Sequence, residues 1–129
     1  MIVDASALIA ILRNEPEAPA FARALADAVP CRLSGVNFVE ASVVADRING
    51  YRGPDLFDRI VRDSGIEVVP VTVEQAQEAR TAYMIYGKGR HPAGLNLGDC
   101  FAYALAKVSG EPLLFKGGDF GKTDVESAL

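Results

Sequence analysis

Short runs of apolar residues alternate along the chain with longer segments in which apolar residues recur every three or four positions. The short runs are bounded by charged residues or by glycine and proline, a pattern typical of buried strands. We therefore predict four strands, at Met1–Val3, Cys31–Ser34, Ile66–Val71 and Pro112–Phe115.

The longer segments have the period of α-helices, and several of them stop near a glycine. Gly50 and Gly110 stand where a glycine commonly follows the last helical turn. Strands that alternate with helices predict an α/β fold with a parallel sheet covered on both faces. The predicted helices are Ser6–Leu12, Pro16–Val29, Asn37–Asn49, Asp55–Asp63, Val73–Tyr86 and Leu97–Val108.

Length and composition favour one domain spanning residues 1–129. No apolar stretch is long enough to cross a bilayer, and the N-terminal "MIVDAS" lacks the basic segment of a secretory signal, so we expect a soluble, cytoplasmic protein.

Cys31 and Cys100 lack the spacing of a zinc or dithiol site and are expected to be buried. The net charge of −4 argues against a uniformly basic nucleic-acid-binding protein.

Four acidic residues stand at the junctions of the predicted elements. Asp4 directly follows the first strand, Glu40 follows the second, and Asp119 follows the last through a pair of glycines. Asp99 opens the helix that leads to the last strand. Because ligands of parallel α/β sheets bind at the carboxyl ends of the strands, these four side chains are the first candidates for a site.

Each of the four acids also has a structural interpretation. Asp4 is placed to cap the first helix, although Ser6 can do so as well. Glu40 lies three residues after Asn37, which is the spacing of a capping box. Asp99 would be stabilised by the dipole of its helix, and the acid after the glycine pair would be an ordinary turn residue.

The shared position of the four acids favours a metal site. Carboxylates that are brought together raise one another's pKa unless a cation neutralises them. Mg²⁺ and Mn²⁺ prefer such oxygen ligands, whereas a chain with one histidine gives little support to a zinc site built on histidines. A carboxylate-held divalent cation can bind a phosphate oxygen and lower the pKa of a water, which predicts phosphodiester hydrolysis.

A segment without acidic residues, between Glu78 and Asp99, supplies positive charge for a phosphate backbone. Its tyrosines, Tyr83 and Tyr86, could stack on bases, but a place in the core is the stronger expectation. The candidate RNA-binding residues are Arg80, Lys88, Arg90 and His91, together with Lys116 near the last acid.

The segments "VDASALIAIL", "NFVEAS", "YGKGRHPAGLNLGDCFAYALAK" and "PLLFKGGDF" occur in an order and at spacings that resemble the PIN-domain ribonucleases, in particular the VapC-type toxins of bacterial toxin–antitoxin pairs. The resemblance covers nearly the whole chain. It implies a three-layer α/β/α sandwich with a small parallel sheet, and hydrogen-bonded support of the first aspartate by Ser6. The residues that it places around Mg²⁺ or Mn²⁺ are Asp4, Glu40, Asp99 and Asp119.

The resemblance also implies a reaction and partners. A metal-activated water attacks the phosphorus of RNA, so that the ribose 2′-hydroxyl need not be the nucleophile. A cognate antitoxin protein blocks the site, and the chain forms homodimers. Many relatives carry a further polar or acidic residue near the last aspartate, where this chain has Gly117 and Gly118, which leaves open whether one or two metal ions bind.

Other functions fit the sequence less well. A phosphatase of the haloacid dehalogenase kind needs a second aspartate where Ser6 stands. A receiver domain needs an acidic pair after the first strand and a phosphoaccepting aspartate after a middle strand. A hydrolase built on Cys100 and His91 would lack an orienting partner. The main alternative is a non-catalytic RNA- or partner-binding domain of the same fold, in which the four carboxylates serve as caps.

Overall fold

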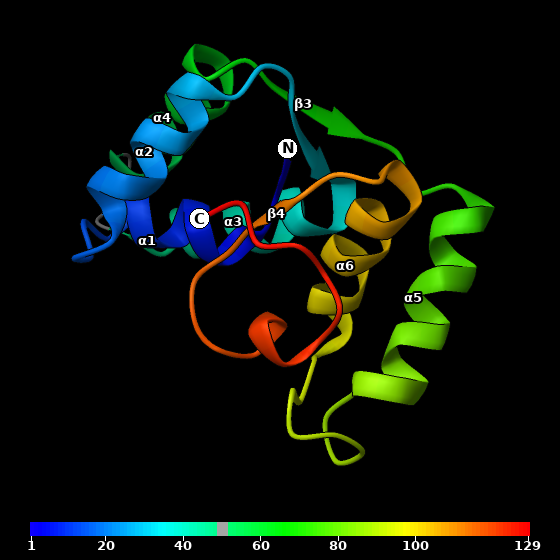
Figure 1. Ribbon diagram of the computed structural model, residues 1–129. Helices are drawn as coiled ribbons and strands as arrows, with labels where there is room; N and C mark the ends of the chain where they lie inside the picture. The colour runs from blue at the N-terminus through cyan, green and yellow to red at the C-terminus, as the bar shows by residue number, and fades with distance from the viewer. Residues whose placement is uncertain (49–51) are drawn as a thin grey trace.

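The computed structural model describes residues 1–48 and 52–129, in which strands and helices alternate along the chain (Figure 1). The strands are β1 (Ile2–Val3), β2 (Cys31–Ser34), β3 (Ile66–Val69) and β4 (Leu113–Leu114). The helices are α1 (Ala5–Leu12), α2 (Ala18–Asp27), α3 (Gly35–Asp46), α4 (Arg52–Asp63), α5 (Val73–Tyr86), α6 (Leu97–Ser109) and the short 3₁₀ helix η1 (Phe120–Lys122).

The strands form one parallel sheet in the order β3-β2-β1-β4. Ile2 of β1 is paired with Arg32 of β2 on one side and with Leu113 of β4 on the other. Because the strands run in the same direction, their carboxyl ends lie at one edge of the sheet, and α1 and α3 begin there, after β1 and β2. The predicted α/β class with a small parallel sheet is confirmed.

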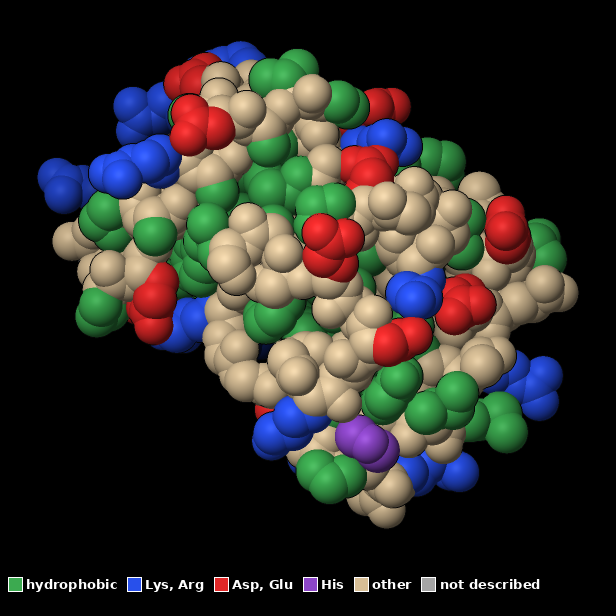
Figure 2. All heavy atoms as spheres, viewed as in Figure 1, with side chains coloured by type: hydrophobic (Ala, Val, Ile, Leu, Met, Phe, Trp, Pro, Cys, Tyr) green, Lys and Arg blue, Asp and Glu red, His purple; other side chains and the backbone are tan. Residues whose placement is uncertain are grey.

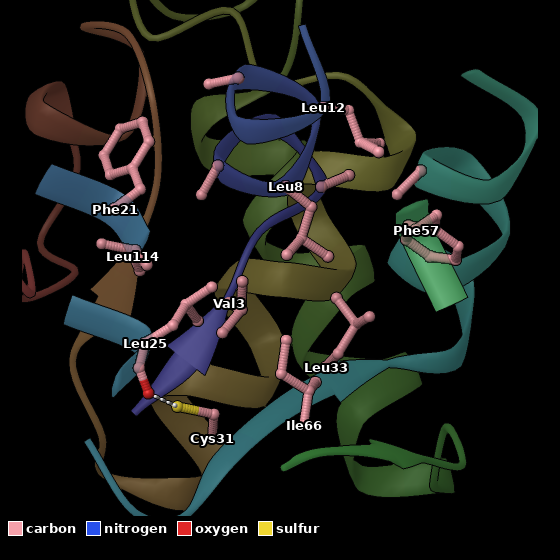
Figure 3. Close-up of a cluster of buried hydrophobic side chains, with 14 of the residues drawn as sticks. Val3, Leu8, Leu12, Phe21, Leu25, Cys31, Leu33, Phe57, Ile66 and Leu114 are labelled. Atoms are coloured by element: carbon pink, nitrogen blue, oxygen red, sulfur yellow. Dashed lines mark hydrogen bonds between the residues drawn. The ribbon is translucent and has the colours of Figure 1, made fainter. Parts of the chain in front are cut away.

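Two apolar clusters lie on opposite faces of the sheet and define the layers. The first contains Val3 and is closed by α1, α2, α3 and α4, with Leu8 of α1 and Phe57 of α4 among its members (Figure 3). The second contains Ile2 and Leu113 and is closed by α5 and α6. Successive residues of a strand point to opposite faces, which explains why Ile2 and Val3 belong to different clusters. Helices on both faces give the α/β/α sandwich.

The third helix begins at Gly35 rather than at the predicted Asn37. The reason is a capping residue that the sequence pattern assigned to the strand: Ser34 Oγ accepts a hydrogen bond from the backbone N–H of Val36 at 3.3 Å. The helix ends at Asp46, before the predicted end at Asn49, and Gly50, the glycine expected to follow it, lies outside the described residues.

Proline explains two further differences from the predicted boundaries. The fourth helix begins at Arg52 rather than at Asp55, because Pro54 falls in the first turn, where a helix makes no use of the backbone N–H that proline lacks. β3 ends at Val69, immediately before Pro70, whose missing N–H cannot continue a strand ladder.

Two expectations from composition can be compared with the structure. Cys31 and Cys100 are both buried as free thiols, as predicted. Among residues 1–48 and 52–129, no helix combines the length and the apolar character needed to cross a membrane.

Candidate active site

A cleft of about 500 Å³ opens at the carboxyl edge of the sheet, where α1, α3 and α6 meet. Its polar lining consists of Asp4 and Ser6 from the start of α1, Glu40 from α3, and Asn96 and Asp99 from the start of α6. The structure thus brings three of the four predicted acids to one cleft from segments that lie far apart in the sequence. The apolar lining comes from α1 and α3 and comprises Ala5, Ile9, Val39, Val43 and Val44.

Asp4 is buried, with 3% of its surface exposed, and is fixed by hydrogen bonds. Its Oδ2 accepts from the backbone N–H of Ser6 at 2.9 Å and from the Ser6 hydroxyl. Ser6 Oγ in turn accepts from the backbone N–H of Lys116 at 3.0 Å, which ties the pair to the segment that follows β4. Asp4 therefore caps α1 and lines the cleft at the same time.

Glu40 lies inside α3, and the capping box with Asn37 that was its structural interpretation is not formed. Ser34 occupies the capping position, so Asn37 is a residue of the first helical turn, and its side chain is fully buried. Asn37 Nδ2 donates to Glu40 Oε1 at 2.7 Å instead of capping the helix. The same spacing that suggests a capping box therefore produces a side-chain contact within the helix.

Asp99 does form a capping box, with Asn96 as the capping residue of α6. Asn96 Oδ1 accepts from the backbone N–H of Asp99 at 2.8 Å, and Asp99 Oδ2 accepts from the backbone N–H of Asn96 at 2.9 Å. The other carboxylate oxygen, Oδ1, takes no part in this cap. Asp99 thus stabilises the start of its helix, as its structural interpretation predicts. The capping box uses only Oδ2, so Oδ1 stays available for a ligand.

The three acids of the cleft influence one another's protonation. Burial raises the pKa of Asp4 and the charge of Glu40 raises it further, against the hydrogen bonds from Ser6, which lower it. Burial likewise raises the pKa of Glu40, and the charge of Asp99 adds to the effect. The pKa of Asp99 is raised to about 6, first by burial and then by the charges of Asp4 and Asp119. A cation in the cleft would oppose these charge effects and favour the ionised carboxylates.

Asp119 lies apart from the other three acids. It is exposed, immediately precedes η1 and makes no capping hydrogen bond with its side chain. It does not line the cleft, although its charge reaches Asp99. The structure therefore places Asp119 near the rim and not within the group formed by the other acids.

The donor chemistry of the cleft fits a hard divalent cation. Carboxylates dominate its polar groups, with a hydroxyl and an amide beside them. In the part of the chain that the structure describes, no three acidic, histidine or cysteine side chains stand close enough to form a ready-made cage. Mg²⁺ needs no such cage, because it keeps several waters and is held by one or two carboxylates together with substrate phosphates.

The acid-free segment forms part of α5 and the loop that leads to α6 (Figure 1). Arg80, Lys88 and Arg90 are exposed. Figure 2 shows Lys and Arg side chains around the purple histidine at the lower end of the view. The His91 ring packs edge-on against Tyr86 with ring centroids 5.1 Å apart, and Tyr86 packs against the second apolar cluster, as expected for a core residue.

Lys116, the remaining candidate for RNA binding, is engaged within the protein. Its Nζ forms ion pairs with Glu15 and with Glu17, the latter at 3.3 Å. These pairs tie the segment after β4 to the connection between α1 and α2 and partly neutralise the charge that a phosphate would meet.

Two residues of the site were missed by sequence reasoning. Asn96 carries a readable signal, because an asparagine three residues before an acid at a helix start is the pattern of a capping box. Gly98 carries none: a Cβ at this glycine would lie 2.0 Å from Glu40 Oε2, a closeness that only the folded structure reveals.

Comparison with known proteins shows matches over nearly the whole chain. A PIN domain family model matches residues 1–126. Ribonuclease VapC of Mycolicibacterium smegmatis is 48% identical over 125 residues, which cover 97% of each chain. Ribonuclease VapC28 of Mycobacterium tuberculosis is 50% identical over 133 residues, covering 100% of this chain and 98% of that protein. The fold matches the crystal structure of Mycobacterium tuberculosis VapC20, a Sarcin-Ricin loop cleaving toxin, with a TM-score of 0.75, 19% identity and coverage of 96% and 95%.

Proposed function

This chain belongs to the PIN-domain family, and we propose that its carboxylate cleft hydrolyses RNA with the help of a divalent cation. Relatives that are about half identical over nearly their full length are named VapC ribonucleases. The class of activity follows from that similarity: the chain is an endoribonuclease, the toxin of a toxin–antitoxin pair.

The observation that carries the assignment of the site is the convergence of Asp4, Glu40 and Asp99 on one cleft at the carboxyl edge of the sheet. Each of these carboxylates has a raised pKa, and in each case a neighbouring acid contributes to the rise. Capping explains the positions of Asp4 and Asp99, but Glu40 caps no helix, so capping alone does not explain why a third carboxylate lies in the same cleft.

We propose that these three carboxylates hold Mg²⁺ or Mn²⁺, with Asp119 adding a ligand from the rim, directly or through water. When bound, the cation activates a water for attack on phosphorus and offsets the charge of the phosphate. The chain's own contribution is orientation: Ser6 fixes the Asp4 carboxylate and Asn96 fixes one oxygen of Asp99.

The exposed cations beside the α5–α6 loop are proposed to bind the RNA backbone. Arg80, Lys88 and Arg90 are free of ion pairs among the contacts of the described residues, whereas Lys116 is held by acids. Replacing Lys88 and Arg90 with alanine should therefore weaken RNA binding and reduce its dependence on salt. The same change at Lys116 should affect RNA binding less.

We further propose two protein partners for this chain in the cytoplasm. A cognate antitoxin would cover the cleft, whose rim on α3 exposes Val39 and Val43. A second copy of the chain would cover the apolar surface of α5 and α6 that includes Met84 and Leu97. Tyr83, expected in the core, lies on this surface with 37% of its area exposed. Light scattering on the isolated chain tests the homodimer.

The test of the proposed function is cleavage of a labelled, structured RNA by purified protein in Mg²⁺, in Mn²⁺ and in EDTA. We expect cleavage with either metal, none in EDTA, and loss in both Asp4→Asn and Asp99→Asn. Folded wild-type protein that binds a series of RNAs without cutting any of them in either metal would support the non-catalytic alternative instead.

A further inference from the structure

Glu40 is the one acid of the cleft that caps no helix, and its position depends on two residues outside the group of acids. Its α3 backbone leaves the long side chain several rotamers, so something else must select one of them. In the structure the Glu40 carboxylate lies against the first turn of α6, next to Gly98 and within hydrogen-bonding distance of Asn37.

Gly98 provides the space that the carboxylate occupies. A Cβ built on Gly98 would lie 2.0 Å from Glu40 Oε2, 2.4 Å from Oε1 and 2.3 Å from Cδ. All three atoms belong to the mobile end of Glu40, and no backbone atom is among them. A side chain at Gly98 would therefore displace the carboxylate without forcing the helices apart.

Asn37 provides the hydrogen bond that holds the carboxylate there. Its Nδ2 donates to Glu40 Oε1 at 2.7 Å and to the carbonyl oxygen of Gly98 at 3.0 Å, so one amide group joins α3 to α6. The Asn37 side chain is fully buried, and its Oδ1 has no hydrogen-bond partner among the described residues. A buried amide with an unsatisfied oxygen is costly for stability, which suggests that it is retained for the site.

We propose that Asn37 and Gly98 are positioning residues that place the Glu40 carboxylate beside Asp99 at the start of α6, where it acts as a ligand of the divalent cation. This inference rests on the proposed function. Neither residue touches the substrate or the cation; both act through Glu40.

The decisive variant is Gly98→Ala, measured by calorimetric titration of the metal-free protein with Mn²⁺ and by thermal unfolding. We expect Mn²⁺ affinity to fall about 10–100-fold, the size of effect seen when residues that orient metal ligands are changed. We expect the Tm to stay the same or rise, because alanine favours a helix more than glycine does. A purely structural role for Gly98 predicts the opposite combination, a lower Tm with unchanged Mn²⁺ affinity.

A double-mutant cycle shows whether the effect passes through Glu40. If it does, adding Gly98→Ala to Glu40→Ala changes the Mn²⁺ affinity no further. The second pair of variants is Asn37→Ala with Gln75→Ala as its control, since Gln75 is also a buried amide with an unpartnered oxygen but, among the described residues, donates no hydrogen bond to Glu40. Both should lower the Tm, and only Asn37→Ala should weaken Mn²⁺ binding.

The outcomes separate this inference from the proposed function. If wild-type protein binds no Mn²⁺, or if Glu40→Ala binds it as wild type does, the metal site as proposed is wrong and the positioning role is wrong with it. If Glu40→Ala weakens binding but Gly98→Ala and Asn37→Ala do not, the site stands and the positioning role alone is overturned. The positioning role is also overturned if Gly98→Ala lowers the Mn²⁺ affinity of the Glu40→Ala variant by the same factor as it lowers that of wild type.

Discussion

Asp4 and Asp99 each serve the fold and the cleft with the same carboxylate. Asp4 caps α1 and Asp99 completes the capping box of α6, so both side chains are fixed before any ligand arrives. Burial raises the pKa of both carboxylates, and nearby negative charge adds to the rise, that of Glu40 for Asp4 and those of Asp4 and Asp119 for Asp99. At the scale of single residues the site is therefore preorganised for a cation at a cost in stability.

Replacing Asp4 with asparagine separates the two roles. Asparagine keeps an oxygen that can accept a hydrogen bond from Ser6 and cap α1. It removes the buried negative charge, which burial and the charge of Glu40 both destabilise. We expect Asp4→Asn to lower RNA cleavage by more than about 100-fold, while the Tm of the metal-free protein stays the same or rises. Cleavage assays and thermal unfolding measure the two effects. A large drop in Tm would contradict this, because it would show that the negative charge of Asp4 is needed to cap α1.

The raised pKa of Asp99 makes a prediction about pH. The folded protein holds the Asp99 proton up to about pH 6, against an ordinary value of 3.8, so this group favours folding at low pH and loses that contribution as the pH rises through 6. Metal-free wild type should thus lose stability relative to Asp99→Asn between pH 4 and 7. Asp99 is half-buried, so we expect about 1 kcal/mol after solvent screening, or roughly 4 °C in Tm. Thermal unfolding of both proteins across this range checks the difference, and parallel curves would contradict it.

At the scale of elements, the close approach of α4 to the end of α3 depends on Gly53. A Cβ on Gly53 would lie 2.0 Å from the carbonyl oxygen of Ala45 and 2.7 Å from that of Ile48, and backbone atoms cannot move aside cheaply. We expect Gly53→Ala to lower the free energy of unfolding by about 1–3 kcal/mol in denaturant titrations. Gly121→Ala, at an exposed glycine with nothing within 4 Å, should leave it nearly unchanged. Equal stability of the two variants would show that α4 does not depend on this approach.

The sequence predicts which elements form more reliably than where they begin. Short apolar runs identified the strands, because helices cover the sheet on both faces, and apolar periodicity identified the helices, because each helix buries one face. The start of α3 was misplaced because Ser34 is the last residue of β2 and the capping residue of α3 at once. The predicted start of α4 at Asp55 is too late, because the apolar pattern begins only after Pro54 and gives no sign that this proline is accommodated in the first turn.

At the scale of the whole molecule, the parallel sheet explains why acids so distant in sequence meet. The rule that ligands bind at the carboxyl ends of parallel strands selected Asp4, Glu40 and Asp119 from the sequence, and Asp99 was added as the acid that opens the helix leading to the last strand. It could not place Asp119, which the structure leaves exposed near the rim, because a loop that follows a strand can lead its residues in several directions. Nor could it reveal Gly98, whose importance comes from a contact between two helices.

The central claim is that a carboxylate-held cation, and not the ribose 2′-hydroxyl, drives cleavage. Its most direct test is to cut an RNA in Mg²⁺, identify the ends of the products, and repeat the reaction with a 2′-deoxy nucleotide at the cleaved position. We predict that the substituted RNA is still cut and that neither substrate yields a 2′,3′-cyclic phosphate, because water supplies the attacking oxygen. Cyclic phosphate ends, together with loss of cleavage on 2′-deoxy substitution, would contradict the account.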